Sequence, residues 1–213
     1  IIGYTVYVDL VKDTFPDKEF LTTPMKKEVD RCVLAFEEAK KGKVVSMICS
    51  GDAGVYGMAG LMYEVGVNYP DVELEIVPGV TADLGGAAVL GAPLIHDFCL
   101  ISLSDLLTPW EKIEARLLGA SQADFVICLY NPSSKKRHDY LQKACDLMMQ
   151  YKSPDTVCGT VCNIGREGEE YHLMTLRELR DTQVDMFTTV FIGNKETQML
   201  NGCLVTPRGY RDV

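Results

Sequence analysis

Two stretches of this sequence join a short apolar run directly to a glycine turn, and this pattern constrains the fold most strongly. KVVSMIC (43–49) has strand length and leads straight into SGDAGVYGMAG (50–60). VELEIV (72–77) leads in the same way into Pro78-Gly79-Val80-Thr81 and a small-residue helix from Ala82 to Leu90. A strand buried on both faces, followed by a glycine turn and a helix, is the βα unit of a parallel sheet. The first part of the chain is therefore predicted to be α/β.

An amphipathic helix is predicted ahead of these units. Residues 26–41 have apolar spacing typical of a helix, and Gly42 follows as a stop signal. The spacing places four apolar residues on one face, opposite the charged residues: Val29, Cys32, Val33 and Phe36. We expect that face to be the buried one.

The rest of the chain is rich in strand-like segments. The expected strands are 98–103, 124–130, 156–164, 169–176, 187–194 and 202–207. Helices are predicted over 111–120 and 138–151, but little helix separates the last three strands. Strands that follow one another without crossover helices favour an antiparallel or mixed sheet.

The Gly91-Ala92-Pro93 turn marks the expected domain boundary, near His96. We predict an α/β fold of two α/β domains, 1–96 with a mainly parallel sheet and 97–213 with a mixed sheet. The sequence has no internal repeat, low-complexity segment or flexible linker, so the two domains are expected to pack together directly. Clefts between such domains are common ligand sites, and we expect one here.

The composition excludes several kinds of partner. The 21 Lys and Arg against 30 Asp and Glu give a formal net charge of −9, and an acidic surface repels the phosphates of nucleic acid. No apolar stretch approaches the roughly 20 residues of a membrane-spanning helix.

Most of the 8 Cys sit in apolar segments, which indicates reduced thiols and a cytoplasmic protein. Because the chain opens with Ile1 on an apolar segment, we expect its natural N-terminus to lie upstream.

The two glycine turns are candidate ligand-binding segments. Glycines allow close approach of the backbone, and ligands of open α/β sheets bind beyond the carboxyl ends of strands. Asp52 either caps the helix that follows or places a negative charge beside a cationic or hydroxylated ligand. Thr81 is the natural N-cap of the next helix. The alternative is a glycine-rich helix that simply packs close to its neighbour, because the first turn is neither G-x-G-x-x-G nor a Walker loop.

Three further features have both a functional and a structural interpretation. His96, beside Asp97, is either an acid–base group or a structural histidine at a turn. The basic cluster Lys135-Lys136-Arg137 either binds carboxylates and phosphates or forms a solvated helix entry. Cys158 and Cys162 point the same way on one expected strand, but no second Cys or His pair stands nearby at zinc spacing, so no metal site is predicted.

The sequence resembles the tetrapyrrole (corrin/porphyrin) methyltransferases over essentially its whole length. Seven segments carry the resemblance: SGDAGVYGMAG (50–60), VPGVTA (77–82), LGAPLIHDF (90–98), ISLSDLLTPW (101–110), ADFVICLYNPSSKKR (123–137), VDMFTTVFIGN (184–194) and LVTPRGY (204–210). The combination of HDF, ISLSDLLTPW, YNP and TPRGY is similar to the branch that methylates carbon 17 and contracts the macrocycle in cobalamin synthesis. Members of the family normally begin with a further strand and an I-G-x-G-P-G loop, which this sequence lacks.

The resemblance implies S-adenosylmethionine bound between the two domains, with S-adenosylhomocysteine as the product. The cofactor contacts that it implies are Gly51, Asp52, Val55, Tyr56, Thr81, Ala82, Tyr130, Asn131, Thr206 and Pro207. The implied substrate is an anionic tetrapyrrole, with Lys135, Lys136, Arg137 and Arg208 countering its carboxylates. A general acid or base for ring contraction is expected in the branch-specific segments, with four candidates: His96, Asp97, Ser104 and Asp105.

The resemblance also implies a homodimer. Two alternatives remain open at this point. The first is another methyltransferase of the superfamily, acting on a different corrinoid position, on diphthamide or on ribosomal RNA. The second is a non-catalytic fragment that binds a tetrapyrrole or a nucleotide.

Overall fold

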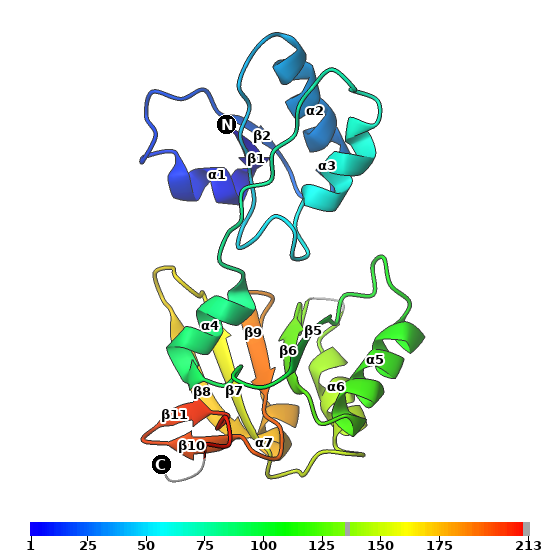
Figure 1. Ribbon diagram of the computed structural model, residues 1–213, viewed down its shortest axis with the longest axis vertical. Coiled ribbons are helices and arrows are strands. Elements are labelled where there is room, and N and C mark those ends of the chain that lie inside the picture. The colour runs from blue at the N-terminus through cyan, green and yellow to red at the C-terminus, as the bar shows by residue number, and fades with distance from the viewer. Residues whose placement is uncertain (135–136, 211–213) are drawn as a thin grey trace. The chain divides into compact units, whose positions relative to one another are not determined.

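The computed structural model describes residues 1–134 and 137–210. The chain divides into two compact units, which meet in sequence between Thr81 and Ala82 (Figure 1). The division falls before α4 (Ala82–Leu90) and β4 (Gly91–Ala92), whereas the sequence placed it after His96. The reason is packing. A Cβ added at Gly86 of α4 would lie 2.7 Å from the ring of Phe191, so this helix lies directly on the second unit's sheet.

The first unit holds a three-stranded sheet of order β2-β1-β3. Its strands are parallel, as the sequence predicted. Its strands are β1 (Ile2–Tyr4), β2 (Leu21–Thr23) and β3 (Met47–Ile48), and its helices are α1 (Thr5–Val11), α2 (Glu28–Lys40) and α3 (Ala59–Gly66). α2 and α3 pack against each other, and the rings of Phe36 and Tyr69 stack at 4.7 Å.

The predicted strand 72–77 is not a strand in the structure, and only two residues of 43–49 pair in the sheet. Along 72–77, half-buried apolar residues such as Leu74 alternate with exposed glutamates. The segment packs its apolar side on the cluster around Phe36 but does not pair with a neighbouring strand. It is therefore buried on one side only, whereas the sequence pattern predicted burial on both.

The predicted helix 26–41 is confirmed as α2, but its buried face is rotated from the prediction. Cys32 and Phe36 are buried as expected, whereas Val29 and Val33 are exposed. Arg31 takes a place in the buried face instead. Its guanidinium donates to the Thr23 hydroxyl at 2.8 Å and to nearby backbone carbonyls of β2 and the residue that follows.

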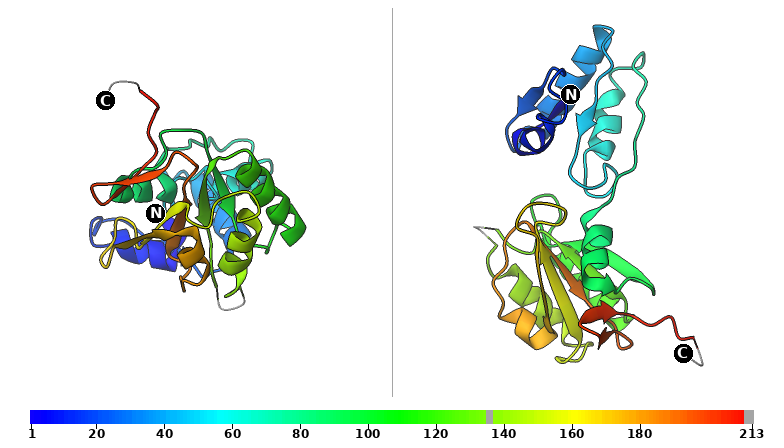
Figure 2. Two further views of the ribbon diagram at one scale, coloured as in Figure 1. Left: turned by 90° about the horizontal axis from the view of Figure 1, so that it is seen from below. Right: turned by 90° about the vertical axis from the view of Figure 1, so that its left-hand side faces the viewer.

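The second unit is built on a five-stranded mixed sheet of order β5-β6-β9-β7-β8, which confirms the predicted mixed sheet. Figure 2 shows each unit from two further directions. β5 and β6 are parallel, and the other neighbours are antiparallel. The strands are β5 (Phe98–Ser102), β6 (Val126–Tyr130), β7 (Val157–Cys162), β8 (Glu170–Thr175) and β9 (Thr188–Ile192). A smaller sheet joins β4 to β10 (Gln198–Leu200) and β11 (Cys203–Val205).

Helices cover both faces of the large sheet. α4 lies on one face, and α5 (Trp110–Gln122), α6 (Tyr140–Met148) and α7 (Leu176–Arg180) lie on the other (Figure 1). Because side chains alternate along a strand, β6 supplies both cores: Ile127 and Leu129 join the cluster under α5 and α6, and Cys128 joins the cluster under α4. This explains why the sequence of β6 is apolar without interruption.

Candidate active site

The two glycine turns of the first unit meet at Asp52. One carboxylate oxygen of Asp52 accepts the backbone N–H of Gly54 at 2.7 Å, and the other accepts the backbone N–H of Gly79 at 2.8 Å. Hydrogen bonds from these backbone groups, that of Gly79 foremost, hold the pKa of Asp52 below its usual value. Asp52 is therefore a fixed negative charge where the two turns meet.

The backbones of the two turns touch and are open to solvent. A Cβ added at Gly79 would lie only 2.1 Å from the carbonyl oxygen of Gly51, so no other residue fits there without a shift of the backbone. Gly51 has φ of +76°, which favours glycine. Both glycines are exposed, as is Tyr56, while Val55 is half-buried. The cofactor contacts predicted in the first glycine turn thus adjoin the second turn at Gly79, whereas the predicted contact Thr81 is buried.

Thr81 and Ala82 stand where the first unit ends and α4 begins. α4 starts at Ala82, so the buried Thr81 occupies the position that the sequence predicted for its cap. In the second unit, the start of α4 is held by Tyr130. The Tyr130 hydroxyl accepts the backbone N–H of Asp83 at 2.6 Å and donates to the Asp83 carboxylate at 3.0 Å.

Asn131 follows β6 in the left-handed conformation, with φ of +54°. Its side-chain amide donates to the Ser102 hydroxyl at 2.9 Å, and the backbone N–H of Ser104 donates to the same oxygen. The backbone carbonyl of Tyr130 accepts the N–H of Leu103. The ends of β5 and β6 are thereby tied together.

A second polar group lies beside this one. Arg137 donates to the Ser104 hydroxyl at 2.7 Å and to the Asp105 carboxylate at 3.3 Å. The other oxygen of Asp105 accepts the Tyr140 hydroxyl at 2.7 Å. These contacts, with the Tyr140 hydrogen bond as the main cause, lower the pKa of Asp105, so it is ionised at neutral pH. The sequence indicated Ser104, Asp105 and Arg137 but not Tyr140, whose partner lies 35 residues away.

His96 and Asp97 lie at the opposite end of β5 from Ser104 and Asp105. Both are exposed, and neither side chain bonds another residue in the described ranges. Asp97 precedes the first residue of β5, and a strand of five residues is about 16 Å long. The four candidate acid–base residues thus do not form one cluster.

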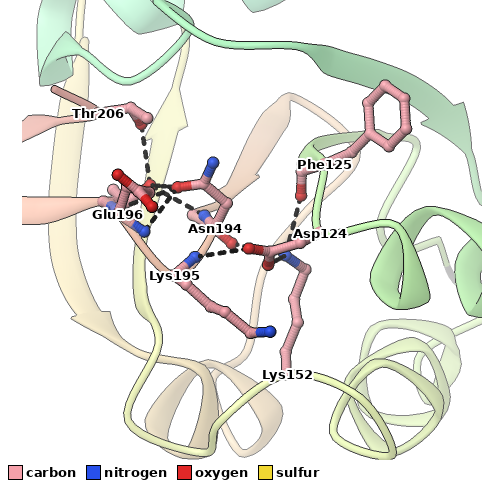
Figure 3. Close-up of polar contacts among 9 residues, drawn as sticks. Asp124, Phe125, Lys152, Asn194, Lys195, Glu196 and Thr206 are labelled. Carbon is pink, nitrogen blue, oxygen red and sulfur yellow. Dashed lines mark hydrogen bonds and ion pairs between the residues drawn. The ribbon is translucent and has the colours of Figure 1, made fainter. Parts of the chain in front are cut away.

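Thr206 is fully buried in a polar network at the edge of the second unit (Figure 3). Its hydroxyl donates to the carbonyl of Pro93 at 2.6 Å and contacts the Thr197 hydroxyl at 2.9 Å. Pro207 is half-buried, and the exposed Arg208 donates to the carbonyl of Ile95 at 3.5 Å. The Thr206 side chain is thus occupied by internal hydrogen bonds.

Tyr130 and Thr206 lie near opposite ends of α4. Tyr130 bonds the start of the helix, and the backbone N–H of Thr206 donates to Ala92, just beyond its end. The nine residues of α4 span about 13 Å. The two groups of cofactor contacts that were predicted within the second unit therefore adjoin opposite ends of α4, and their contact with one ligand stays a prediction.

The network around Thr206 continues to a lysine that the sequence did not single out (Figure 3). The ammonium of Lys152 donates to the carbonyls of Phe125 and Gly193, each at 2.9 Å, and pairs with Asp124 at 3.3 Å. Burial lowers the pKa of Lys152 despite the neighbouring carboxylate. No local signal distinguishes this lysine from a surface lysine, because all its partners come from other parts of the chain.

Three further predictions, on two lysines, on metal sites and on membrane-spanning helices, do not involve the contacts described above. Lys135 and Lys136 lie outside the described residues. Within residues 1–134 and 137–210, no group of three His, Cys, Asp or Glu side chains is placed to hold a metal ion. In the same ranges, no helix is long and apolar enough to cross a membrane.

Comparison with known proteins defines the class. Residues 1–180 match the model of the tetrapyrrole (corrin/porphyrin) methylases, and the chain belongs to this family. The family and the two-domain α/β fold, both expected from the sequence, are confirmed. The fold is shared with a solved uroporphyrin-III C-methyltransferase from Thermus thermophilus, complexed with S-adenyl homocysteine, at 18% identity and a TM-score of 0.67, covering 90% of this chain and 84% of that one.

Two relatives of higher identity are named as C(17)-methyltransferases. A probable cobalt-factor III C(17)-methyltransferase of Salmonella typhimurium is 49% identical over 211 residues, which cover 99% of this chain and 88% of that protein. A precorrin-3B C(17)-methyltransferase of a Sinorhizobium species is 40% identical, with 98% and 85% covered. The crystal structure of the methyltransferase CobJ matches with a TM-score of 0.86 at 34% identity, covering 97% of this chain and 87% of that one.

Proposed function

We propose that this protein transfers a methyl group from S-adenosylmethionine to carbon 17 of cobalt-factor III or precorrin-3B, and contracts the macrocycle, in cobalamin synthesis. The observation that carries the proposal is the nearly full-length similarity to relatives named for these two reactions. The branch-specific segment ISLSDLLTPW supports it, because its Ser102, Ser104 and Asp105 are built into one hydrogen-bonded group.

The residues of the first unit fit a cationic methyl donor. The exposed backbones of Gly51 and Gly79 allow close approach, and Asp52 adds a fixed negative charge beside them. Val55 and Tyr56 are the adjoining side chains that would contact it, with Thr81. S-adenosylmethionine, when bound, supplies a methyl group activated by its sulfonium charge.

Methyl transfer of this kind is an in-line displacement at carbon and requires no metal. The chain's own contribution is positioning: it holds the donor and the acceptor carbon in line and excludes water. Sulfonium charge disappears as the methyl group moves. Neutral acceptors such as the carbonyl of Gly51 therefore suit the donor, since they bind it without over-stabilising its ground state.

Cationic side chains are proposed to bind the carboxylates of the substrate. With a net charge of −9, the chain needs local positive charge to attract an anionic ligand. Arg137 lies at the ends of β5 and β6, and Arg208 is exposed near the C-terminus. Lys135 and Lys136 adjoin Arg137 in sequence and stay predictions. Homodimer formation and a cytoplasmic location also stay predictions.

Ring contraction requires proton movements, and the exposed His96 and Asp97 are the candidates with free side chains within the described parts of the chain. We expect His96→Ala or Asp97→Asn to slow ring contraction if either group moves a proton. Unchanged turnover in both variants would remove this end of β5 from the mechanism.

The function is tested by incubating the protein with S-adenosylmethionine labelled in its methyl group and with cobalt-factor III or precorrin-3B. A labelled product with a contracted ring supports the proposal. Label on another corrinoid position, or on another substrate, would favour a different methyltransferase of the family. Binding without transfer would favour a non-catalytic protein.

A further inference from the structure

Arg137 is held more firmly than a solvent-exposed arginine. Its side chain is 13% exposed, and a single nitrogen, Nη1, donates to both Ser104 and Asp105. These contacts link two segments that are distant in sequence: Ser104 and Asp105 follow β5, whereas Arg137 precedes α6. The guanidinium therefore has a defined position beside the ends of β5 and β6.

Asp105 has both oxygens engaged and is itself fixed. One oxygen faces Arg137 and the other accepts the Tyr140 hydroxyl. The Tyr140 ring in turn lies 4.6 Å from the ring of Trp110, centroid to centroid, at the start of α5. A carboxylate held between an arginine and a tyrosine is suited to orient the arginine.

Arg137 keeps hydrogen-bonding capacity beyond these contacts. A guanidinium carries five N–H donors, yet Nε of Arg137 is buried without an acceptor among the described residues. A buried donor without an acceptor is costly, so this arrangement is not explained by stability alone. Nε itself is buried, so an anionic group would be bound by the other guanidinium nitrogens: the described contacts use only Nη1.

An apolar surface adjoins this cation. Leu106 and Leu107 directly follow Asp105 and are 72% and 99% exposed. Two leucines so exposed in one short loop contribute little to the core of the unit. An apolar contact next to a fixed cation matches a flat macrocycle with carboxylates at its rim.

We propose that Asp105 is a positioning residue, which orients Arg137 to bind a carboxylate of the tetrapyrrole, while Leu106 and Leu107 contact the macrocycle. This inference rests on the proposed function and deepens it. It assigns Ser104 and Asp105 to substrate binding rather than to acid–base chemistry, and it leaves ring contraction to other groups.

Binding and turnover of cobalt-factor III test the proposal with four proteins: wild type, Asp105→Asn, Arg137→Gln and the double variant. The dissociation constant is measured with S-adenosylhomocysteine present, and kcat and KM with S-adenosylmethionine. We expect Arg137→Gln to raise the dissociation constant and KM about tenfold or more, because a charge-assisted hydrogen bond is lost. Asp105→Asn should raise both severalfold and leave kcat within about twofold. The double variant should resemble Arg137→Gln, because the two residues act as a unit.

Arg137→Lys, which keeps the charge but not the planar fork, should fall between wild type and Arg137→Gln. The control is Asp155→Asn, which breaks another aspartate–arginine pair, with the exposed Arg177, and should change neither constant. Thermal melting of each variant identifies any that fails to fold.

The contact made by the leucines is tested with a separate pair of variants. Leu107→Ser should weaken binding severalfold, whereas Val44→Ser, at a fully exposed valine of the first unit, should not.

Other outcomes of the same measurements would contradict the inference. If Asp105→Asn lowers kcat about a hundredfold at unchanged KM and removes one limb of the pH profile, Asp105 is an acid–base residue and the inference is wrong. Additive effects of Asp105→Asn and Arg137→Gln would also overturn it. If wild type methylates cobalt-factor III and the Arg137 variants behave like wild type, the inference fails while the proposed function stands. If wild type itself transfers no methyl group, both fail.

Discussion

The carboxylate of Asp52 accepts the backbone N–H of Gly79 at 2.8 Å, across 27 residues of sequence. This bond joins the turn after β3 to the turn that leads to α4. It explains how two glycine-rich segments that are separate in sequence form one surface. It also explains why that surface carries a fixed negative charge.

Replacing Asp52 with asparagine should weaken binding of S-adenosylmethionine about tenfold or more. The substitution removes the charge, and an amide N–H cannot accept one of the two backbone N–H groups that the carboxylate now binds. Isothermal titration calorimetry measures the affinity. Asp9→Asn, at an exposed carboxylate paired with Lys12, is the control. An unchanged affinity would separate Asp52 from the donor site.

Gly79→Ala should lower the free energy of unfolding by about 1–3 kcal/mol, because the added methyl group overlaps the carbonyl of Gly51. Gly119→Ala is the matched control. Gly119 lies inside α5 with open space around it, so alanine should raise stability by about 0.5–1 kcal/mol. Urea denaturation measures both. A neutral Gly79→Ala would show that the two turns separate at little cost.

Lys152→Met should destabilise the second unit by about 3 kcal/mol, because it leaves the carbonyls of Phe125 and Gly193 without their lysine donor and Asp124 without its ion-pair partner. Lys143→Met removes an exposed lysine paired with Asp139 and should have little effect. Thermal unfolding followed by circular dichroism compares the two variants. Equal melting temperatures would mean that the buried network adds nothing to stability.

The first unit is expected to lose stability in acid, because the pKa of Glu38 is lower in the folded protein. Hydrogen bonds from Lys41 and then Lys43 lower the pKa of Glu38 from its ordinary value of 4.5 to about 2. A carboxyl whose pKa is lower in the folded state stabilises the fold above the unfolded value, and this stability is lost as the pH falls from 4.5 toward 2.

Glu38→Gln should therefore remove part of the pH dependence of the melting temperature in that interval. Glu64→Gln, at an exposed carboxylate of α3, serves as the control. High salt should reduce the difference between wild type and Glu38→Gln, since ions screen the exposed ammonium groups of Lys41 and Lys43. Identical pH curves for wild type and Glu38→Gln at low salt would contradict the prediction.

Local sequence patterns were sufficient to predict those elements whose structure depends on neighbouring residues in the chain. The helix predicted from Ala82 to Leu90 has those bounds, because a threonine just before it and the glycine at its end mark them in the local sequence. The predicted strand over 124–130 contains β6, whose continuous apolar sequence reflects helices on both faces. The family, too, was recognisable from short motifs.

Features that depend on distant partners were not predictable. The helical spacing of α2 placed Val29 and Val33 inside, but Arg31 is buried there because Thr23 and nearby carbonyls accept its hydrogens. The segment 72–77 has the composition of a strand, yet backbone pairing requires a partner that local pattern does not specify. By contrast, the separation of His96 from Asp105 follows from the predicted strand 98–103, which lies between them and contains β5.

By itself the sequence determined the α/β class, the family and the turns that carry Asp52 and Gly79, because periodicity and glycine positions are local properties of the chain. Only the tertiary structure decided that Asp52 bonds Gly79, that Asp105 bonds Arg137 and that Thr206 is closed off by Thr197. Each of these contacts depends on a partner chosen by packing across the fold.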